Sequence, residues 1–244
     1  MKLDILAIAA HPDDAELSCS GTLLQHKRLG YKTGIIDLTQ GELGSRGSIA
    51  LRKQESDAAS EIMQLDIREN LQFRDGFFQN DEKHQLALIQ MIRKYQPDIV
   101  LANAPNDRHP DHGRAASLAK EACYYAGLVK IETTLDGHVQ QAWRPKKIFN
   151  YIQDQYLEPD FVMDISDVIS QKMDCILAFK SQFLDDESNG PATYISSEIY
   201  TNRVMYRNNL MGKKIGVAYG EGFLSVHSHI GFKSFESFIL PEFA

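Results

Sequence analysis

Residues 3–16 read LDILAIAAHPDDAE, an apolar run that ends abruptly in a cluster of histidine and acidic side chains. The apolar run over 3–10 predicts a buried strand. The following stretch, 17–29, has apolar side chains at helical spacing and is closed by Gly30, which is typical of a helix end. A strand followed directly by a helix is the first half of a βαβ unit.

The same alternation continues through the first hundred residues and predicts a parallel sheet covered by helices. We therefore expect an α/β fold: a Rossmann-like, mostly parallel sheet with helices on both faces, formed by a single domain over residues 1–244. The predicted strands after the first are 34–38, 70–73, 98–103, 147–152 and 161–165, and the predicted helices are 51–63, 84–95 and 168–179. A polar loop is expected over 185–194, and the glycine-rich segment beyond it has no clear assignment.

A second polar cluster, His109-Pro110-Asp111-His112, follows the strand predicted at 98–103. The common doubly wound strand order places the first and fourth strands side by side, and ligands bind outside the carboxyl ends of such strands. The clusters at 11–16 and 109–112 are therefore expected to converge on one crevice.

Imidazole nitrogen and carboxylate oxygen are ligands of Zn²⁺, and a catalytic zinc typically has three protein ligands. The spacing of His11 and Asp14 suits one side of a tight turn, so we expect these two residues and His112 to bind the metal. Asp13 is then the candidate general base that accepts a proton from the attacking water. The residues alone do not separate zinc from Fe²⁺ or another divalent ion.

His109 and Asp111 are candidates for a supporting catalytic role. His109 lies close enough to His112 to serve the same pocket, where an imidazolium protonates a leaving amine or stabilises an oxyanion. Asp111 is expected to orient an imidazole by accepting its second N–H group.

Plainer interpretations remain open for both clusters. Proline and acidic residues at 12–16 also suit the start of a helix, and residues 109–112 suit a loop that caps a helix near Gly113. A metal bound for structural or regulatory purposes is a further alternative, although a structural zinc normally has four protein ligands. The remaining histidines carry weaker signals: His26, His84 and His138 as surface residues, and His227 with His229 on one strand face without a matching carboxylate.

Composition limits the possible partners. The chain has 244 residues, 43% of them hydrophobic, and a formal net charge of −7, which disfavours nucleic acid as a partner. Its three cysteines are widely spaced and suggest neither disulfides nor a zinc ribbon, which favours a reducing cytoplasm. The apolar run at 3–10 is too short to span a membrane. The sequence leaves a homo-oligomer open.

Arginines near the two clusters are candidates for binding a substrate carboxylate. The loop from Gly41 to Gly47 lacks the spacing of a phosphate-binding or dinucleotide-binding loop. Arg46, Arg52 and Arg108 lie in or beside the expected crevice, and a guanidinium binds a carboxylate through two hydrogen bonds. Tyr194 is a candidate donor to the oxyanion.

The segment Ala10-His11-Pro12-Asp13-Asp14-Ala15-Glu16, together with 109–112, resembles the LmbE-like, or PIG-L, zinc-dependent de-N-acetylases. The resemblance extends over most of the chain and implies hydrolysis of the acetamide of an N-acetylglucosamine conjugate. It implies zinc at His11, Asp14 and His112 and a general base at Asp13. It also implies that His109 assists as an acid or electrostatic stabiliser, paired with Asp111.

Within that family, the Gly41–Gly47 loop, Arg52 and the segment Tyr219-Gly220-Glu221-Gly222-Phe223 look most like the deacetylases of bacillithiol biosynthesis. That likeness implies N-acetylglucosaminyl malate as the substrate, and the two malate carboxylates would give the arginines a purpose. A different substrate, such as a diacetylchitobiose-like sugar, remains the alternative.

Overall fold

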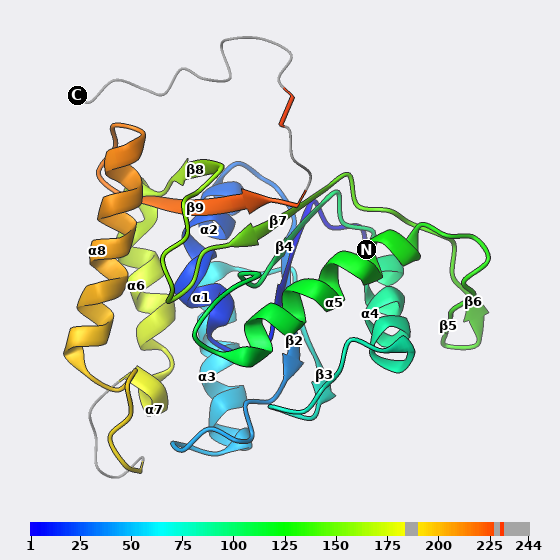
Figure 1. Ribbon diagram of the computed structural model, residues 1–244, viewed down its shortest axis with the longest axis horizontal. Helices are drawn as coiled ribbons and strands as arrows, with labels where there is room; N and C mark the ends of the chain where they lie inside the picture. Colours follow the sequence, from blue (N-terminus) through cyan, green and yellow to red (C-terminus); the bar gives the residue numbers. More distant parts are fainter. Residues whose placement is uncertain (184–189, 227–229, 232–244) are drawn as a thin grey trace.

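A seven-stranded sheet forms the centre of the chain (Figure 1). The computed structural model describes residues 1–183, 190–226 and 230–231. The strand order is β3-β2-β1-β4-β7-β9-β8, in which β3 to β7 pair in parallel and β9 is antiparallel to both of its neighbours. The strands are β1 (Ile5–Ala9), β2 (Thr33–Thr39), β3 (Ile67–Phe73), β4 (Ile99–Ala102), β7 (Lys147–Tyr151), β8 (Phe161–Asp164) and β9 (Gly220–Ser225), and a separate small hairpin contains β5 (Thr134–Leu135) and β6 (His138–Val139). The predicted α/β class and mostly parallel sheet are confirmed.

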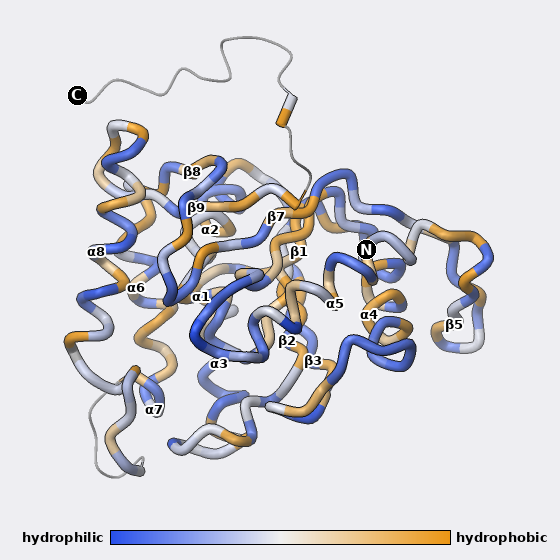
Figure 2. The backbone as a smooth tube through the Cα atoms, in the orientation of Figure 1, coloured by the Kyte–Doolittle hydropathy of each residue, from blue (hydrophilic) through white to orange (hydrophobic). Residues whose placement is uncertain are grey.

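Helices cover both faces of this sheet, because the strands bury apolar side chains in both directions. In β1, Ile5, Ala7 and Ala9 belong to one core cluster with helices α1, α2, α3, α6 and α8. Leu6 and Ile8 belong to a second cluster with α4 and α5. Figure 2 shows a hydrophobic stretch along β1 in the interior. The helices are α1 (Asp14–Ser18), α2 (Ser20–Arg28), α3 (Ile49–Met63), α4 (Glu82–Tyr95), α5 (Pro110–Ala126), the 3₁₀ turn η1 (Ser166–Val168), α6 (Ile169–Leu177), α7 (Lys180–Phe183) and α8 (Glu198–Lys214).

Strands β1 and β4 lie side by side, as the sequence predicted. Ile5 is in register with Ile99, and Ala7 with Leu101, in a parallel pair. Their carboxyl ends therefore open onto the same edge of the sheet. The loop after β1 leads into α1, and the loop after β4 leads into α5, so both polar clusters are delivered to this edge.

The helix predicted over 17–29 is two helices, α1 and α2, which meet at Cys19. Cys19 has φ −136° and ψ 9°, outside the helical region, so the backbone changes direction there. The first amides of α2 are capped by a residue from the other end of the chain: Gly21 N and Thr22 N donate to the carboxylate of Glu221 at 2.9 and 2.7 Å. The apolar spacing over 17–29 continues through Cys19, so the sequence pattern does not reveal that the helix is interrupted there.

Strand β3 begins at Ile67, three residues before its predicted start at Asn70. Charged residues at this position are unusual for a strand, but Arg68 is buried with two acidic partners. Its guanidinium donates to Glu16 Oε1 at 2.5 Å and to Asp37 Oδ2 at 2.8 Å. A buried charge is tolerated when it is paired in this way, and the pairing is invisible in the local sequence.

The glycine-rich C-terminal segment brings α8 close to strand β9. A Cβ atom at Gly212 would lie 2.7 Å from Tyr219 N, so only glycine permits this approach of helix to strand. Strand β9 also carries Glu221, which is buried and lies 2.6 Å from the ammonium nitrogen of Lys172. His227, His229 and residues 185–189 of the polar loop predicted at 185–194 lie outside the described residues. None of the described helices is both long and apolar enough to cross a membrane.

Candidate active site

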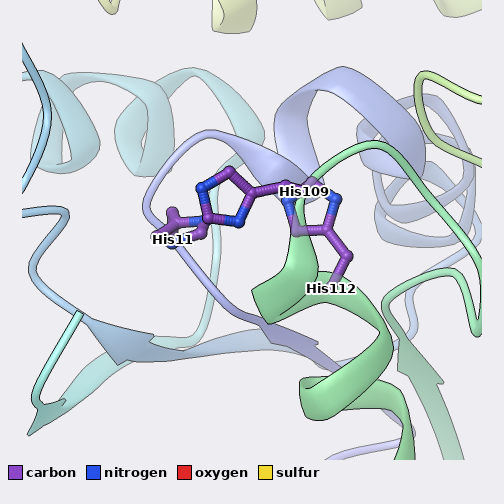
Figure 3. Close-up of side chains that lie close together, drawn as sticks. All are labelled: His11, His109 and His112. Carbon is purple, nitrogen blue, oxygen red and sulfur yellow. The ribbon is translucent and has the colours of Figure 1, made fainter. Parts of the chain in front are cut away.

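A cavity of about 340 Å³ opens at the carboxyl edge of β1 and β4 and is lined by both polar clusters. The loop after β1 contributes the residues around His11, and the start of α5 contributes His112. Figure 3 shows the rings of His11, His109 and His112 gathered where these two segments meet. The convergence expected from strand order is therefore present in the structure.

The three imidazoles lie within metal-binding distance of one another. One ring nitrogen from each of His11, His109 and His112 lies within 4.8 Å of the other two. His109 is the N-cap of α5, and its Nδ1 accepts a hydrogen bond from the backbone N–H of Asp111 at 3.3 Å. The helix begins at Pro110 rather than near Gly113, so residues 109–112 both cap α5 and line the cavity.

The carboxylate of Asp14 lies between two of these imidazoles. Its Oδ1 is 3.0 Å from His112 Nε2, and its Oδ2 is 3.6 Å from His11 Nδ1. Burial alone would raise the pKa of Asp14, but the charge of His112 and the hydrogen bond of His11 hold it well below its usual range. Asp14 is therefore ionised and presents oxygen to the space shared by the two histidines.

A second carboxylate stands behind each of these two imidazoles. Asp107 Oδ2 is 2.5 Å from His112 Nδ1, and Asp75 Oδ1 is 2.9 Å from His11 Nε2. Asp111 Oδ2 lies 3.4 Å from the same His11 nitrogen. A carboxylate on the far nitrogen fixes the tautomer and orientation of a metal-ligating histidine and raises its basicity. Among the described residues, two groups have ligand atoms close enough to share a cation: His11 with His109 and His112, and His11 with Asp75 and Asp111. Asp14 adds a carboxylate beside His11 and His112.

The acidic surroundings also favour positive charge. Burial lowers the pKa of His112, but the charge of Asp14 and the hydrogen bond of Asp107 outweigh it and raise that pKa to about 9. The pKa of His11 is likewise raised well above its usual value, against the effect of burial, by Asp111, Asp14 and Asp75. Burial lowers the pKa of His109, and the positive charges of His11 and His112 act in the same direction.

Asp13 has a strained backbone and is paired with Arg52. Its φ is 125°, in a region that costs a non-glycine residue about 1–3 kcal/mol. Arg52 Nη1 donates to Asp13 Oδ2 at 3.0 Å and to the carbonyl of Pro12 at 2.6 Å. Burial raises the pKa of Asp13 to about 7, against the opposing charge of Arg52. Such a pKa suits a general base at neutral pH.

The family resemblance implied that Asp111 pairs with His109. The carboxylate of Asp111 is instead turned towards the loop that follows β3. Its Oδ2 accepts the backbone N–H of Gly76 at 2.8 Å, and its Oδ1 accepts from Arg114 at 2.7 Å. The imidazole that Asp111 approaches is that of His11. Its contact with His109 runs through its backbone N–H instead.

The predicted substrate-binding residues all line the cavity but differ in their partners. Arg46 is buried, and its guanidinium donates to the carbonyls of Ser181 and Pro191 at 2.9 and 3.1 Å. Arg108 is half-exposed at the rim; it donates to Asp154 at 3.1 Å and stacks over the ring of Tyr194 at 4.6 Å. Arg108 and Tyr194 are thus the members of this set most open to a ligand.

Four polar residues of the site were not among the sequence predictions. Asp75 follows β3, Asn103 follows β4 and Gln153 follows β7, while Asp107 belongs to the same loop as His109. Each lies just beyond the carboxyl end of a parallel strand, which is the signal that identified the two clusters. Amide side chains are uncommon metal ligands. A prediction based on histidine and carboxylate residues therefore did not include Asn103 and Gln153.

The chain is similar to known deacetylases. The family profile described as PIG-L, GlcNAc-PI de-N-acetylase, matches residues 6–123. Diacetylchitobiose deacetylase of Thermococcus kodakarensis is 31% identical over 197 residues, which cover 75% of this chain and 71% of the relative. A probable N-acetyl-alpha-D-glucosaminyl L-malate deacetylase 2 of Bacillus subtilis is 26% identical over 227 residues, which cover 82% of this chain and 97% of that protein.

The fold is shared over nearly its whole length with a solved structure. A conserved protein from Thermus thermophilus superposes with a TM-score of 0.83 and 36% identity, covering 95% of this chain and 98% of the other. The chain is thus an α/β protein with a cluster of histidine and carboxylate side chains at the carboxyl edge of its sheet. The chain belongs to the PIG-L, or LmbE-like, family.

Proposed function

We propose that this protein is a metal-dependent hydrolase that removes the N-acetyl group from a glucosamine conjugate and releases acetate. The observation that carries the proposal is the cluster of His11, Asp14 and His112 on one wall of a cavity that also contains Asp13. Membership of the PIG-L family and similarity to two kinds of deacetylase support the same reaction.

His11, Asp14 and His112 are the residues that would hold the cation, with Zn²⁺ as the first choice and Fe²⁺ as the alternative. A divalent cation bound by them supplies Lewis acidity, which polarises a carbonyl and acidifies water. Asp107 and Asp75 keep the two histidines in place through their far ring nitrogens. This arrangement uses three protein ligands, as catalytic zinc sites do.

Asp13 accepts the proton from the attacking water. Its carboxylate is buried beside Asp14 but makes its direct hydrogen bond to Arg52, which leaves it free of the cation. His109 lies across the site, with ring centroids 4.7 Å from His11 and 5.2 Å from His112. From that position we assign it the role of protonating the leaving amine or stabilising the oxyanion, with Tyr194 as a further candidate donor. Asp111 supports the site by contacting His11.

The substrate we favour is N-acetylglucosaminyl malate, as in bacillithiol biosynthesis. The half-exposed guanidinium of Arg108 at the rim suits a carboxylate of the malate group. We assign Arg52 to Asp13 and Arg46 to the carbonyls of Ser181 and Pro191, because those are their partners in the structure. Diacetylchitobiose is the second candidate, since its deacetylase is the relative with the higher identity of the two.

The proposal is tested by measuring amine release from a panel of acetylated sugars. The metal-loaded protein is incubated with N-acetylglucosaminyl malate, N,N′-diacetylchitobiose and N-acetylglucosamine, and the free amine is quantified by a fluorogenic reagent. We expect release from the malate conjugate to be fastest. Faster release from diacetylchitobiose would favour the second substrate, and no release from any of the three would contradict the deacetylase function.

A further inference from the structure

Two buried side-chain amides hold the carboxylate of Asp14, one on each oxygen. Asn103 Nδ2 donates to Asp14 Oδ2 at 3.0 Å, and Gln153 Nε2 donates to Oδ1 at 3.1 Å. Both amides are buried, with 0% of Asn103 and 4% of Gln153 exposed. Gln153 Nε2 is also 3.4 Å from His112 Nε2, so one amide contacts two of the residues that would bind the metal.

Backbone groups dictate which end of each amide faces Asp14. The N–H of Ala10 donates to Asn103 Oδ1 at 2.9 Å, and the N–H of Ala104 donates to Gln153 Oε1 at 3.0 Å. A backbone N–H only donates, so each amide oxygen must point towards it and each NH₂ group must point away. Asn103 Nδ2 also donates to Gln153 Oε1 at 3.1 Å, which locks the two amides to each other.

The sheet itself fixes this pair. Asp14, Asn103 and Gln153 follow β1, β4 and β7, three neighbouring parallel strands whose carboxyl ends lie in a row. Asn150 Nδ2 donates to the carbonyl of Asn103 at 2.6 Å, and Arg207 from α8 donates to the carbonyl of Gln153. The amides are therefore held by backbone contacts on both sides.

We propose that Asn103 and Gln153 are positioning residues that set the orientation of Asp14 and thereby the affinity of the site for its metal. This inference rests on the metal dependence of the proposed function. An aspartate whose two oxygens accept fixed donors cannot rotate about its Cβ–Cγ bond, so its remaining lone pairs keep one direction. Partners of this kind typically change metal affinity by about 10- to 100-fold when removed.

The test compares two glutamines of equal burial in the same cavity. Gln153→Met removes the amide while keeping the length of the side chain. Gln182→Met is the matched control, because Gln182 is also 4% exposed and lines the cavity, but its amide donates to Arg46 O and Ser181 Oγ. Zn²⁺ affinity is measured by competition with a chromophoric chelator. The visible absorption of the Co²⁺-loaded proteins reports the coordination geometry.

We expect Gln153→Met to bind Zn²⁺ about 10- to 100-fold more weakly than the wild type and to change the Co²⁺ spectrum, while Gln182→Met changes neither. Gln153→Asn, which keeps an amide but shortens its reach, should behave like Gln153→Met and serves if that variant does not fold. Wild-type affinity and spectrum in both Gln153 variants, or an equal loss in Gln182→Met, would overturn the inference. Because these measurements use no substrate, a protein that binds metal in this way but deacetylates nothing would contradict the proposed function alone.

Discussion

Arg52 and Asp13 form a buried ion pair at 3.0 Å, and the same guanidinium nitrogen donates to the carbonyl of Pro12. The pair connects the third helix to the loop after the first strand. Arg52 thereby holds the carboxylate of a residue whose backbone is strained. Asp13 and Asp14, two adjacent residues of one sequence motif, thus have different partners: Arg52 for Asp13, and His11 and His112 for Asp14.

Replacing Asp13, the proposed base, should remove activity but not bound metal. Asp13→Asn keeps the size of the side chain and loses proton affinity, so we expect kcat to fall by roughly 10² to 10⁴, the usual contribution of a positioned general base. Zinc content after dialysis should equal that of the wild type. Asp57→Asn, on the exposed side of α3, is the control for the substitution itself. Loss of zinc from Asp13→Asn would make Asp13 a ligand.

Replacing one of the three proposed metal ligands should remove both the bound metal and the activity. His11→Ala, Asp14→Ala and His112→Ala each leave two of three ligands, so we expect loss of bound zinc and of turnover. His109→Ala should keep its zinc, although its ring lies within 4.8 Å of the other two histidines. Metal content is measured by elemental analysis after dialysis. Retention of stoichiometric zinc in two of the three ligand variants would show that the assignment is wrong.

Arg108 should discriminate substrates by charge. If it binds a malate carboxylate, Arg108→Gln should lower kcat/KM for N-acetylglucosaminyl malate by about 10- to 100-fold, the equivalent of roughly 1.5–3 kcal/mol for a hydrogen bond to a charged group. Activity on an uncharged N-acetylglucosaminide should change little. Arg144, which stacks on Tyr124 at 4.5 Å much as Arg108 stacks on Tyr194, provides the matched control. An equal loss of kcat/KM on both substrates would show that Arg108 does not bind the substrate carboxylate.

The buried pair of Lys172 and Glu221 should make a large contribution to stability. Neither side chain is more than 1% exposed, so Lys172→Met leaves the charge of Glu221 buried without its cation. We expect the free energy of unfolding to fall by about 3–5 kcal/mol, measured by urea denaturation. Lys53→Met, which breaks an exposed pair with Asp57, should cost less than about 1 kcal/mol. Adding Glu221→Gln to Lys172→Met should restore part of the loss.

Asp66 should make stability depend on acid pH. Burial raises its pKa, but hydrogen bonds from Lys27 and from Thr33 N outweigh that effect and lower it. A carboxyl group with a lowered pKa in the folded state stabilises the protein above its unfolded pKa, about 3.9, and this contribution disappears as the pH falls through the folded value. Asp66→Asn should therefore cost up to about 1 kcal/mol at pH 7 and nothing once the wild-type carboxyl is protonated. If the free energies of unfolding of wild type and Asp66→Asn differed by the same amount at every pH in that range, the ionisation of Asp66 would not contribute to stability.

The sequence predicts the part of the fold that depends on local periodicity and on the adjacency of two strands. Strands β1 and β4 were expected side by side, and this expectation placed His11 and His112 in one crevice. The insertion of β9 between β7 and β8 was not predicted, because the glycines at 220 and 222 weaken the strand pattern. The close packing that requires those glycines depends on α8, which is distant in sequence.

The residues that complete the site depend on tertiary contacts. Asp75 stands behind His11, and Gln153 holds Asp14, yet the two are separated from those partners by 64 and 139 positions. Arg52 lies near the cavity as predicted, but the sequence does not show that Asp13 is its partner. Local patterns identify residue types suited to a metal ligand, whereas the hydrogen bonds that hold His11 and Asp14 come from residues distant in sequence.

The cap that Glu221 places on α2 has a consequence for the synthesis of the chain. Thr22, whose backbone N–H and hydroxyl both donate to this carboxylate, precedes it by 199 positions. During translation the start of α2 therefore lacks its acceptor until Glu221 has left the ribosome. Lys172 emerges 49 positions before its counter-ion, Glu221. Helix α2 therefore completes its hydrogen bonding long after its own residues are made.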